Sequence, residues 1–172
     1  MRILFVCTGN LCRSPLAEGL ARAAPALRGV EPTSAGTWAV EGLPATSEAV
    51  AVAAALGVDI SGHRSRRLRA GDVAAADLVV VMTSVHRAEV VRLAPGHADK
   101  VVLLKELAEL EPAPAADDGD RLTALLSAPR PAPRRALDLD DPMGLPLSAY
   151  ERAAGEIAAG IEALGALLGQ RA

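Results

Sequence analysis

Residues 1–15 read MRILFVCTGNLCRSP, and this stretch decides both the fold and the chemistry that we expect. The apolar run over residues 2–6 is typical of a buried strand, and Cys7 follows it directly. Arg13 stands six positions after Cys7, and Pro15 suits the first turn of a helix. The order predicts a strand, then a loop that can bind phosphate, then a helix.

A loop of this kind favours a thiolate nucleophile. Its inward-pointing backbone N–H groups and the positive end of the following helix form an anion nest. The same field stabilises the thiolate of Cys7. Arg13 can bind two phosphoryl oxygens, and Ser14 offers a hydroxyl to the sulfur. Gly9 allows close backbone approach or a positive φ, and Asn10 tolerates the left-handed region. None of these roles needs a metal.

The full run CTGNLCRSP over residues 7–15 resembles the active-site loop of the low-molecular-weight protein tyrosine phosphatase family. That family also carries the loop at its N-terminus, after the first strand. The resemblance implies a set of loop residues that bind the substrate, namely Thr8, Gly9, Asn10, Leu11, Cys12 and Ser14. The structural alternative is a strand, turn and helix with two incidental cysteines.

Composition agrees with an enzyme of one domain spanning residues 1–172. Hydrophobic residues make up 51% of the chain, and the net charge of −3 argues against a nucleic-acid partner. Both cysteines lie in the loop, so no structural disulfide framework is expected. The N-terminus lacks a secretory pattern, and the apolar stretch 49–58 is too short to span a bilayer. We therefore expect a cytoplasmic protein without membrane insertion.

Strand-like and helical patterns alternate along the chain. The strand-like runs are 2–6, 33–34, 78–82 and 101–104, and the helical patterns are 15–27, 47–56, 84–93 and 148–168. This alternation predicts an α/β fold with a parallel sheet and helices on both faces, and the family resemblance implies a four-stranded, flavodoxin-like sheet. Ligands in such sheets bind at the carboxyl ends of the strands, where the Cys7 loop begins.

A Pro/Ala-rich insert at about 112–135 interrupts this alternation. Five of the twelve prolines lie between residues 112 and 133, which predicts a mobile loop with one short helix over 120–127. Shorter members of the family lack an insert of this size. It is either a solvated linker or a segment that overhangs the active site.

A second motif, DLDDP over residues 138–142, supplies candidate acids. A phosphomonoester leaving group must be protonated, and the water that hydrolyses a phosphocysteine must lose a proton. The family resemblance implies that Asp141, the aspartate directly before proline, does both. Asp138 and Asp140 would favour its protonated form by like-charge repulsion if they lie close. Taken alone, Asp-Pro is also an ordinary turn dipeptide.

Three further residues match the family. Ser34 corresponds to a serine that braces the loop asparagine, and His63 corresponds to a histidine that supports the loop. Trp38 corresponds to an aromatic residue that flanks the substrate ring, although a core position is the alternative. We expect no metal and no cofactor, because Cys7 and Cys12 lack the usual spacing of zinc ligands.

The substrate is less sharply indicated than the chemistry. Phosphotyrosine-directed members usually have an aromatic residue after the Asp-Pro pair, where this chain has Met143, and the frequent aspartate after the third strand is replaced by Thr83. A related branch hydrolyses phosphoarginine and carries threonine where this chain has Leu11. Leu11 favours phosphotyrosine, so we expect a phosphotyrosine phosphatase acting on phosphorylated proteins, with a protein-arginine phosphatase as the alternative.

Two other classes are disfavoured. Thioredoxin-coupled arsenate reductases share this loop but need cysteines outside it, and this chain has none. A noncatalytic phosphate-binding module has no reason to combine Cys7, Arg13, Ser14 and Asp141. Cys12 suggests a reversible disulfide with Cys7, the alternative being simple packing beneath the loop. The oligomeric state is not indicated by the sequence.

Overall fold

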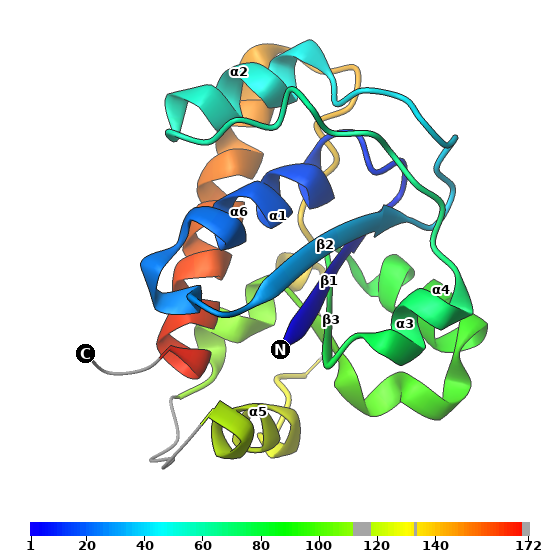
Figure 1. Cartoon of the computed structure of the whole chain (residues 1–172), viewed down its shortest axis with the longest axis vertical. Helices are drawn as coiled ribbons and strands as arrows, with labels where there is room; N and C mark the ends of the chain where they lie inside the picture. The colour runs from blue at the N-terminus through cyan, green and yellow to red at the C-terminus, as the bar shows by residue number, and fades with distance from the viewer. Residues whose placement is uncertain (112–117, 133, 170–172) are drawn as a thin grey trace.

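The computed structural model describes residues 1–111, 118–132 and 134–169 (Figure 1). Its centre is a parallel sheet with the strand order β2-β1-β3-β4. The strands are β1 (Arg2–Cys7), β2 (Glu31–Gly36), β3 (Leu78–Val81) and β4 (Val101–Leu103). This confirms the predicted α/β class and the four-stranded parallel sheet, and it extends the second strand on both sides of residues 33–34.

Alternate residues of β1 pack into two hydrophobic layers. Ile3 and Phe5 join the core beneath α1 (Arg13–Ala23), α2 (Ser47–Ala55) and α6 (Leu147–Leu168). Leu4 and Val6 join the core beneath α3 (Ala70–Ala75) and α4 (Ser84–Leu93). Helices lie on both sides of the sheet (Figure 1). Because side chains alternate across a strand, β1 is a continuous apolar run from Ile3 onward that is buried on both faces.

Short 3-10 helices connect several elements. They are η1 (Pro25–Leu27), η2 (Pro95–Lys100), η3 (Lys105–Glu109) and η4 (Arg135–Leu137). The helix predicted over 15–27 is divided at Ala24, which is extended because a residue before proline disfavours the helical region. The helices predicted over 47–56, 84–93 and 148–168 are confirmed to within one residue at each end.

The helix predicted inside the insert is α5 (Asp118–Ser127). Its Leu125 is buried in the same core as α6, and α5 lies near the end of the molecule where β1 begins (Figure 1). Cys7 stands at the opposite end of that strand. Residues 112–117 and 133 of the predicted insert lie outside the described part. Within the ranges described, no helix combines the length and apolarity that a membrane span requires.

Candidate active site

Sheet order brings Cys7 to the middle of the carboxyl edge. β1 lies between β2 and β3, and Cys7 is its last residue, paired with Gly36 of β2. The chain then forms the loop 8–12 and enters α1 at Arg13. Cys7 is buried, with 2% of the residue exposed.

The loop backbone is held by the segment after β2. The amides of Thr37 and Trp38 donate to the carbonyls of Cys7 and Thr8, at 2.9 and 3.0 Å. A Cβ on Gly36 would lie only 2.4 Å from the Thr8 carbonyl oxygen, so this close approach requires glycine. The left-handed residue is Asn10, with φ 55°; Gly9 is not among the glycines with positive φ.

Asn10 connects the loop to three other segments. Its Nδ2 donates to Ser14 Oγ at 2.9 Å and to Ser34 Oγ at 2.8 Å. Its Oδ1 accepts from the amide of Arg66 at 2.9 Å, and its carbonyl oxygen lies 2.8 Å from His63 Nε2. The side chain is fully buried, so these bonds replace its hydration and fix the loop conformation.

The hydroxyl of Ser14 lies 3.0 Å from the sulfur of Cys7. The same oxygen accepts from Asn10 Nδ2, and its own proton has two acceptors within reach, the Cys7 sulfur and, at 3.5 Å, the Ala35 carbonyl oxygen. A hydroxyl donor at this distance stabilises a thiolate.

Cys12 has a different environment. Its thiol lies 3.5 Å from Thr46 Oγ1 and 3.9 Å from Tyr150 Oη. Burial is the main cause that raises the pKa of Cys12, which keeps it a neutral thiol. The two thiols therefore have different neighbours: Thr46 and Tyr150 for Cys12, and Ser14 for Cys7. A disulfide between the two cysteines stays a hypothesis.

Arg13 links the loop that follows Cys7 to the second motif, residues 138–142. Its side chain is buried, and its Nη1 donates to the carbonyl of Leu139 at 3.0 Å. Its Nη2 lies 2.5 Å from Asp141 Oδ2. Its Nε is buried and has no hydrogen-bond partner among the described residues. The Leu139 amide donates to the carbonyl of Met82 at 2.8 Å. This bond holds residues 138–142, called the acid loop for their three aspartates, against the residue that follows β3.

The two other aspartates of the motif have partners of their own. Asp138 accepts from the amide and hydroxyl of Ser84 at 2.6 and 3.1 Å. Asp140 is exposed and pairs with Arg135 at 2.5 Å, which lowers the pKa of Asp140. Asp141 Oδ1 accepts from the amide of Met143 at 3.2 Å.

The three candidate substrate-contacting side chains, Trp38, Leu11 and Met143, differ in their exposure. Trp38 is 60% exposed, its Nε1 donates to Glu89 at 2.8 Å, and the Arg67 guanidinium lies 5.2 Å from its ring centre. Trp38 is therefore a surface residue and not part of the core. Leu11 is half-buried against the core, and Met143 is exposed.

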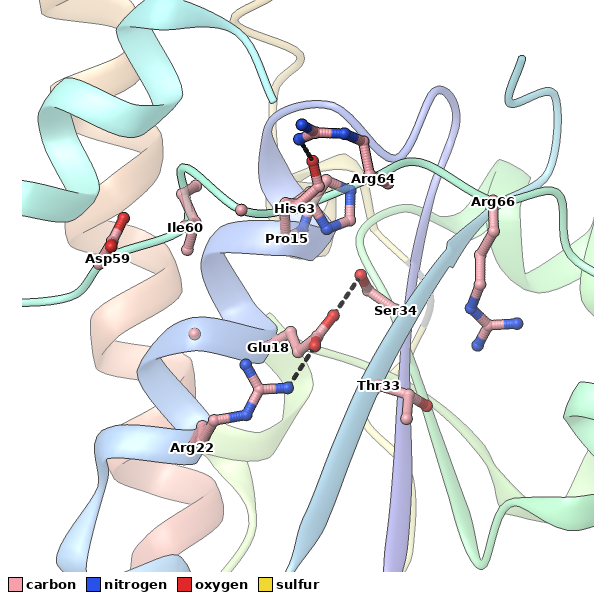
Figure 2. Close-up of a pocket in the computed structure, with 12 residues that line it drawn as sticks. Pro15, Glu18, Arg22, Thr33, Ser34, Asp59, Ile60, His63, Arg64 and Arg66 are labelled. Atoms are coloured by element: carbon pink, nitrogen blue, oxygen red, sulfur yellow. Dashed lines mark hydrogen bonds and ion pairs between the residues drawn. The ribbon is translucent and has the colours of Figure 1, made fainter. Parts of the chain in front are cut away.

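Behind the loop lies a cavity of about 420 Å³ (Figure 2). Ser34 and His63, which hold Asn10, line it together with Glu18 and Arg22. Ser34 Oγ donates to Glu18 Oε2 at 2.6 Å, and Glu18 pairs with Arg22 at 2.5 Å (Figure 2). Cys7, Arg13 and Asp141 do not line this cavity. Sequence reasoning did not identify Glu18, which carries no motif of its own.

His86 was also missed by the sequence analysis. It is buried in the first turn of α4, between Thr8 of the loop and Thr83, the N-cap of α4. Desolvation and the neighbouring Arg13 lower the pKa of His86 to about 4. The only signal in the sequence was a histidine three residues after Thr83. Among the residues with described positions, no group of three or more His, Cys, Asp or Glu side chains could hold a metal ion.

Comparison with known proteins agrees with this geometry. Residues 2–120 match the family model described as "Low molecular weight phosphotyrosine protein phosphatase". The "Probable low molecular weight protein-tyrosine-phosphatase EpsP" of Ralstonia solanacearum is 35% identical over 94% of this chain and 91% of its own length. A "Protein-arginine-phosphatase" of Geobacillus stearothermophilus is also 35% identical, over 91% of this chain and 88% of its own length.

A solved structure described as "Low Molecular Weight Protein Tyrosine Phosphatase from T. tengcongensis" has a TM-score of 0.75 and 40% identity, covering 95% of this chain and 97% of that one. The match to the family model covers more than half of the chain, and the relatives cover nearly all of it. The chain therefore belongs to the low molecular weight protein-tyrosine-phosphatase family, a family of phosphatases that act on phosphoproteins.

Proposed function

We propose that this phosphatase hydrolyses phosphotyrosine in proteins through a phosphocysteine intermediate, with Cys7 as nucleophile and Asp141 as acid and base. One observation carries the proposal. The Arg13 side chain, in the loop that holds Cys7, reaches Asp141 at 2.5 Å, while Ser14 lies 3.0 Å from the sulfur. Nucleophile, phosphoryl ligand and proton donor therefore belong to one connected site.

In the first step the Cys7 thiolate attacks phosphorus. The S–P bond forms as the P–O bond to the tyrosyl oxygen breaks, and Asp141 gives its proton to that oxygen. The loop amides and Arg13 bind the equatorial oxygens, where charge is concentrated in the transition state. The buried Nε of Arg13, which has no partner in the described part of the chain, is a donor suited to one of them.

In the second step water attacks the phosphocysteine. Asp141 takes a proton from the water, the S–P bond breaks, and the sulfur leaves as a thiolate. The Ser14 hydroxyl stabilises that developing negative charge by donating a hydrogen bond to the sulfur. The products are tyrosine and inorganic phosphate, and the enzyme returns to its starting state.

Support for an aromatic substrate comes from two side chains. Leu11 is a bulky apolar residue within the loop. Trp38 exposes its ring, and its backbone amide bonds to the carbonyl of Thr8 in the loop. Glu89 and Arg67 hold the indole in place, so its exposed surface is preorganised to contact a phenyl ring.

A protein-arginine phosphatase is the second candidate. The relative from Geobacillus stearothermophilus that bears this name covers nearly the whole chain, at the same identity as the tyrosine-phosphatase relative. Met143 also stands where an aromatic residue would recognise tyrosine.

The deciding experiment compares kcat/KM on phosphotyrosine and phosphoarginine peptides of matched sequence. We expect a preference for phosphotyrosine of at least about tenfold, a difference of about 1.4 kcal/mol in transition-state binding. Leu11→Thr should narrow this preference and Leu11→Ile should keep it. Cys7→Ser abolishes both activities if the chemistry is as proposed. A preference for phosphoarginine would overturn the substrate assignment and leave the chemistry intact.

Asp141→Asn tests the proton donor. Since general acid catalysis contributes about 10²- to 10⁴-fold, we expect kcat on phosphotyrosine peptides to fall by roughly 10²-fold or more. The loss should be smaller on 4-nitrophenyl phosphate, whose leaving group needs little protonation. Asp140→Asn is the matched control, because that carboxylate pairs with Arg135. Equal losses on the two substrates would argue against Asp141 as the acid.

A further inference from the structure

His86, in the first turn of α4, connects the phosphate-binding loop with Thr83, the residue that caps this helix. Its Nε2 lies 2.9 Å from Thr8 Oγ1, and its Nδ1 lies 2.9 Å from Thr83 Oγ1. The ring is buried, with 4% of the residue exposed, so its polar atoms depend on these two partners. Thr8 directly follows the nucleophile Cys7.

The bridge suits a neutral imidazole. A neutral ring has one donor and one acceptor nitrogen, so one threonine hydroxyl donates to it and the other accepts from it. Thr83 Oγ1 also accepts from the His86 amide at 3.2 Å, as the cap of α4, which leaves its proton free for Nδ1. In that arrangement Nε2–H donates to Thr8, and the proton of the Thr8 hydroxyl is free to turn toward the substrate.

The surroundings of His86 keep it neutral. Burial and the positive charge of Arg13 on α1 oppose protonation. Glu89 on α4, and Asp141 and Asp138 on the acid loop, favour it, but their combined effect is smaller. The bridge therefore keeps one hydrogen-bond pattern across the neutral pH range.

The first turn of α4 also holds the acid loop. Ser84 donates through its amide and its hydroxyl to Asp138, three residues before Asp141. At the adjoining end of β3, the Met82 carbonyl accepts from the Leu139 amide. The corner formed by Met82, Thr83, Ser84 and His86 thus contacts both catalytic loops.

We propose that His86 is a positioning residue for hydrolysis of the phosphate monoester. It holds Thr8, and with it the loop next to Cys7, in a fixed position relative to the acid loop, residues 138–142. The proposal rests on the phosphatase activity described above but not on the choice between tyrosine and arginine. Thr83, which stands where the family frequently has aspartate, takes part as the second partner of the imidazole.

Two substitutions separate the two bonds of the bridge. In His86→Gln the amide reaches the position of Nε2 and keeps the bond to Thr8. In His86→Asn the shorter amide reaches only the position of Nδ1 and keeps the bond to Thr83. We expect kcat on 4-nitrophenyl phosphate to fall about tenfold in His86→Asn and by less than about threefold in His86→Gln, because small displacements of a reacting group reduce rates strongly. KM and the inhibition constant of inorganic phosphate should change by less than about twofold in both.

A double-mutant cycle with Thr8→Val completes the test. If Thr8 and His86 act through their shared bond, Thr8→Val combined with His86→Asn should be no slower than the slower single variant. Additive losses would overturn the proposal, as would equal losses of kcat in the Asn and Gln variants.

A second measurement does not depend on turnover. In ¹⁵N spectra of imidazole-labelled protein, Thr8→Val should shift Nε2 of His86, and Thr83→Val should shift Nδ1. Unchanged resonances would overturn the bridge itself. A wild-type protein with no activity that depends on Cys7 would instead contradict the proposed function, and the spectra would still decide on His86.

Discussion

Asn10 combines a backbone that favours glycine with a side chain that glycine lacks. Its φ of 55° lies in the left-handed region, and its amide bonds to Ser14, Ser34 and the Arg66 backbone. Asparagine is among the few residues that meet both demands, because its short polar side chain tolerates this region. The loop conformation around Cys7 depends on that combination.

Two substitutions at Asn10 separate these contributions. Asn10→Gly keeps the backbone conformation and loses the buried hydrogen bonds, so we expect about 2–3 kcal/mol less stability. Asn10→Ala also places a Cβ in the left-handed region, which should cost roughly 1 kcal/mol more. Urea unfolding of the three proteins measures both differences. Equal stabilities of the Gly and Ala variants would show that the backbone conformation carries no cost.

The low pKa of His86 predicts a loss of stability in mild acid. The unfolded chain binds a proton at His86 below pH of about 6.5, whereas the folded chain does so only below about 4. The unfolded state therefore holds more protons between these values, and stability falls as the pH is lowered through that window. The full effect is about 3 kcal/mol, by linkage. His86→Gln should lack this part of the decrease, as measured by urea unfolding at pH of about 7, 5.5 and 4.5. Parallel curves for the two proteins would contradict a neutral buried imidazole.

At the scale of the element, Gly160 lets α6 pack closely against Leu104. A Cβ on Gly160 would lie 2.6 Å from Leu104 Cγ, next to η3, so the helix packs there at backbone distance. Gly155 stands in the same helix, and a Cβ added there would meet nothing within 4 Å. The two glycines therefore have opposite consequences within one helix.

Alanine substitutions should reveal this contrast. Gly160→Ala forces Leu104 out of its position and should destabilise the protein by about 1–3 kcal/mol. Gly155→Ala should instead stabilise it by about 0.5–1 kcal/mol, since alanine has the higher helix propensity. Thermal unfolding gives both values, and a stabilised Gly160→Ala variant would be inconsistent with the described packing.

The elements that could be predicted from the sequence were those with a strong periodic or apolar pattern. β1, β3 and β4 are continuous apolar runs because both of their faces are buried, and α4 and α6 are long enough to show helical periodicity. α3 spans only six residues, too few for such a signal. It begins where Asp72 accepts from the amide of Arg69, a cap that is visible only once the fold is known.

The site was predictable where one motif held all its parts. Cys7, Arg13 and Ser14 lie close together in the chain, so their spacing was enough to predict that they belong to one candidate site. Glu18 on α1 reaches the loop through Ser34 of β2, and His86 on α4 bonds to Thr8 of the loop itself. The contacts of Glu18 and His86 result from the packing of α1 and α4 against the sheet. No local sequence pattern predicts that packing.

At the scale of the molecule, positive charge is concentrated beside the loop although the net charge is −3. Arg64, Arg66, Arg67 and Arg69 follow one another on the segment that bonds to Asn10 and Gly36. Arg66 and Arg69 pair with Asp72 and Glu41, whereas the Arg64 guanidinium donates to the carbonyl of His63. We expect this segment to attract anionic substrates.

Salt dependence tests this expectation. The kcat/KM for an acidic phosphopeptide should fall about threefold or more between roughly 20 and 200 mM salt, since screening weakens interactions between exposed charges. Arg64→Gln should reduce both the rate and its salt dependence. Arg28→Gln is the matched control, because Arg28 is exposed just before β2, at the opposite end of the sheet. Identical behaviour of the two variants would exclude a steering role for Arg64.

The bond between Arg13 and Asp141 spans 128 positions of the chain. During synthesis the cysteine loop leaves the ribosome early, whereas the acid follows only after β4, η3 and α5 have been made. If Asp141 is the proton donor, as proposed, a nascent chain that ends before it lacks the group that protonates the leaving oxygen. In that mechanism hydrolytic competence arises late in synthesis, once Asp141 can bond to Arg13.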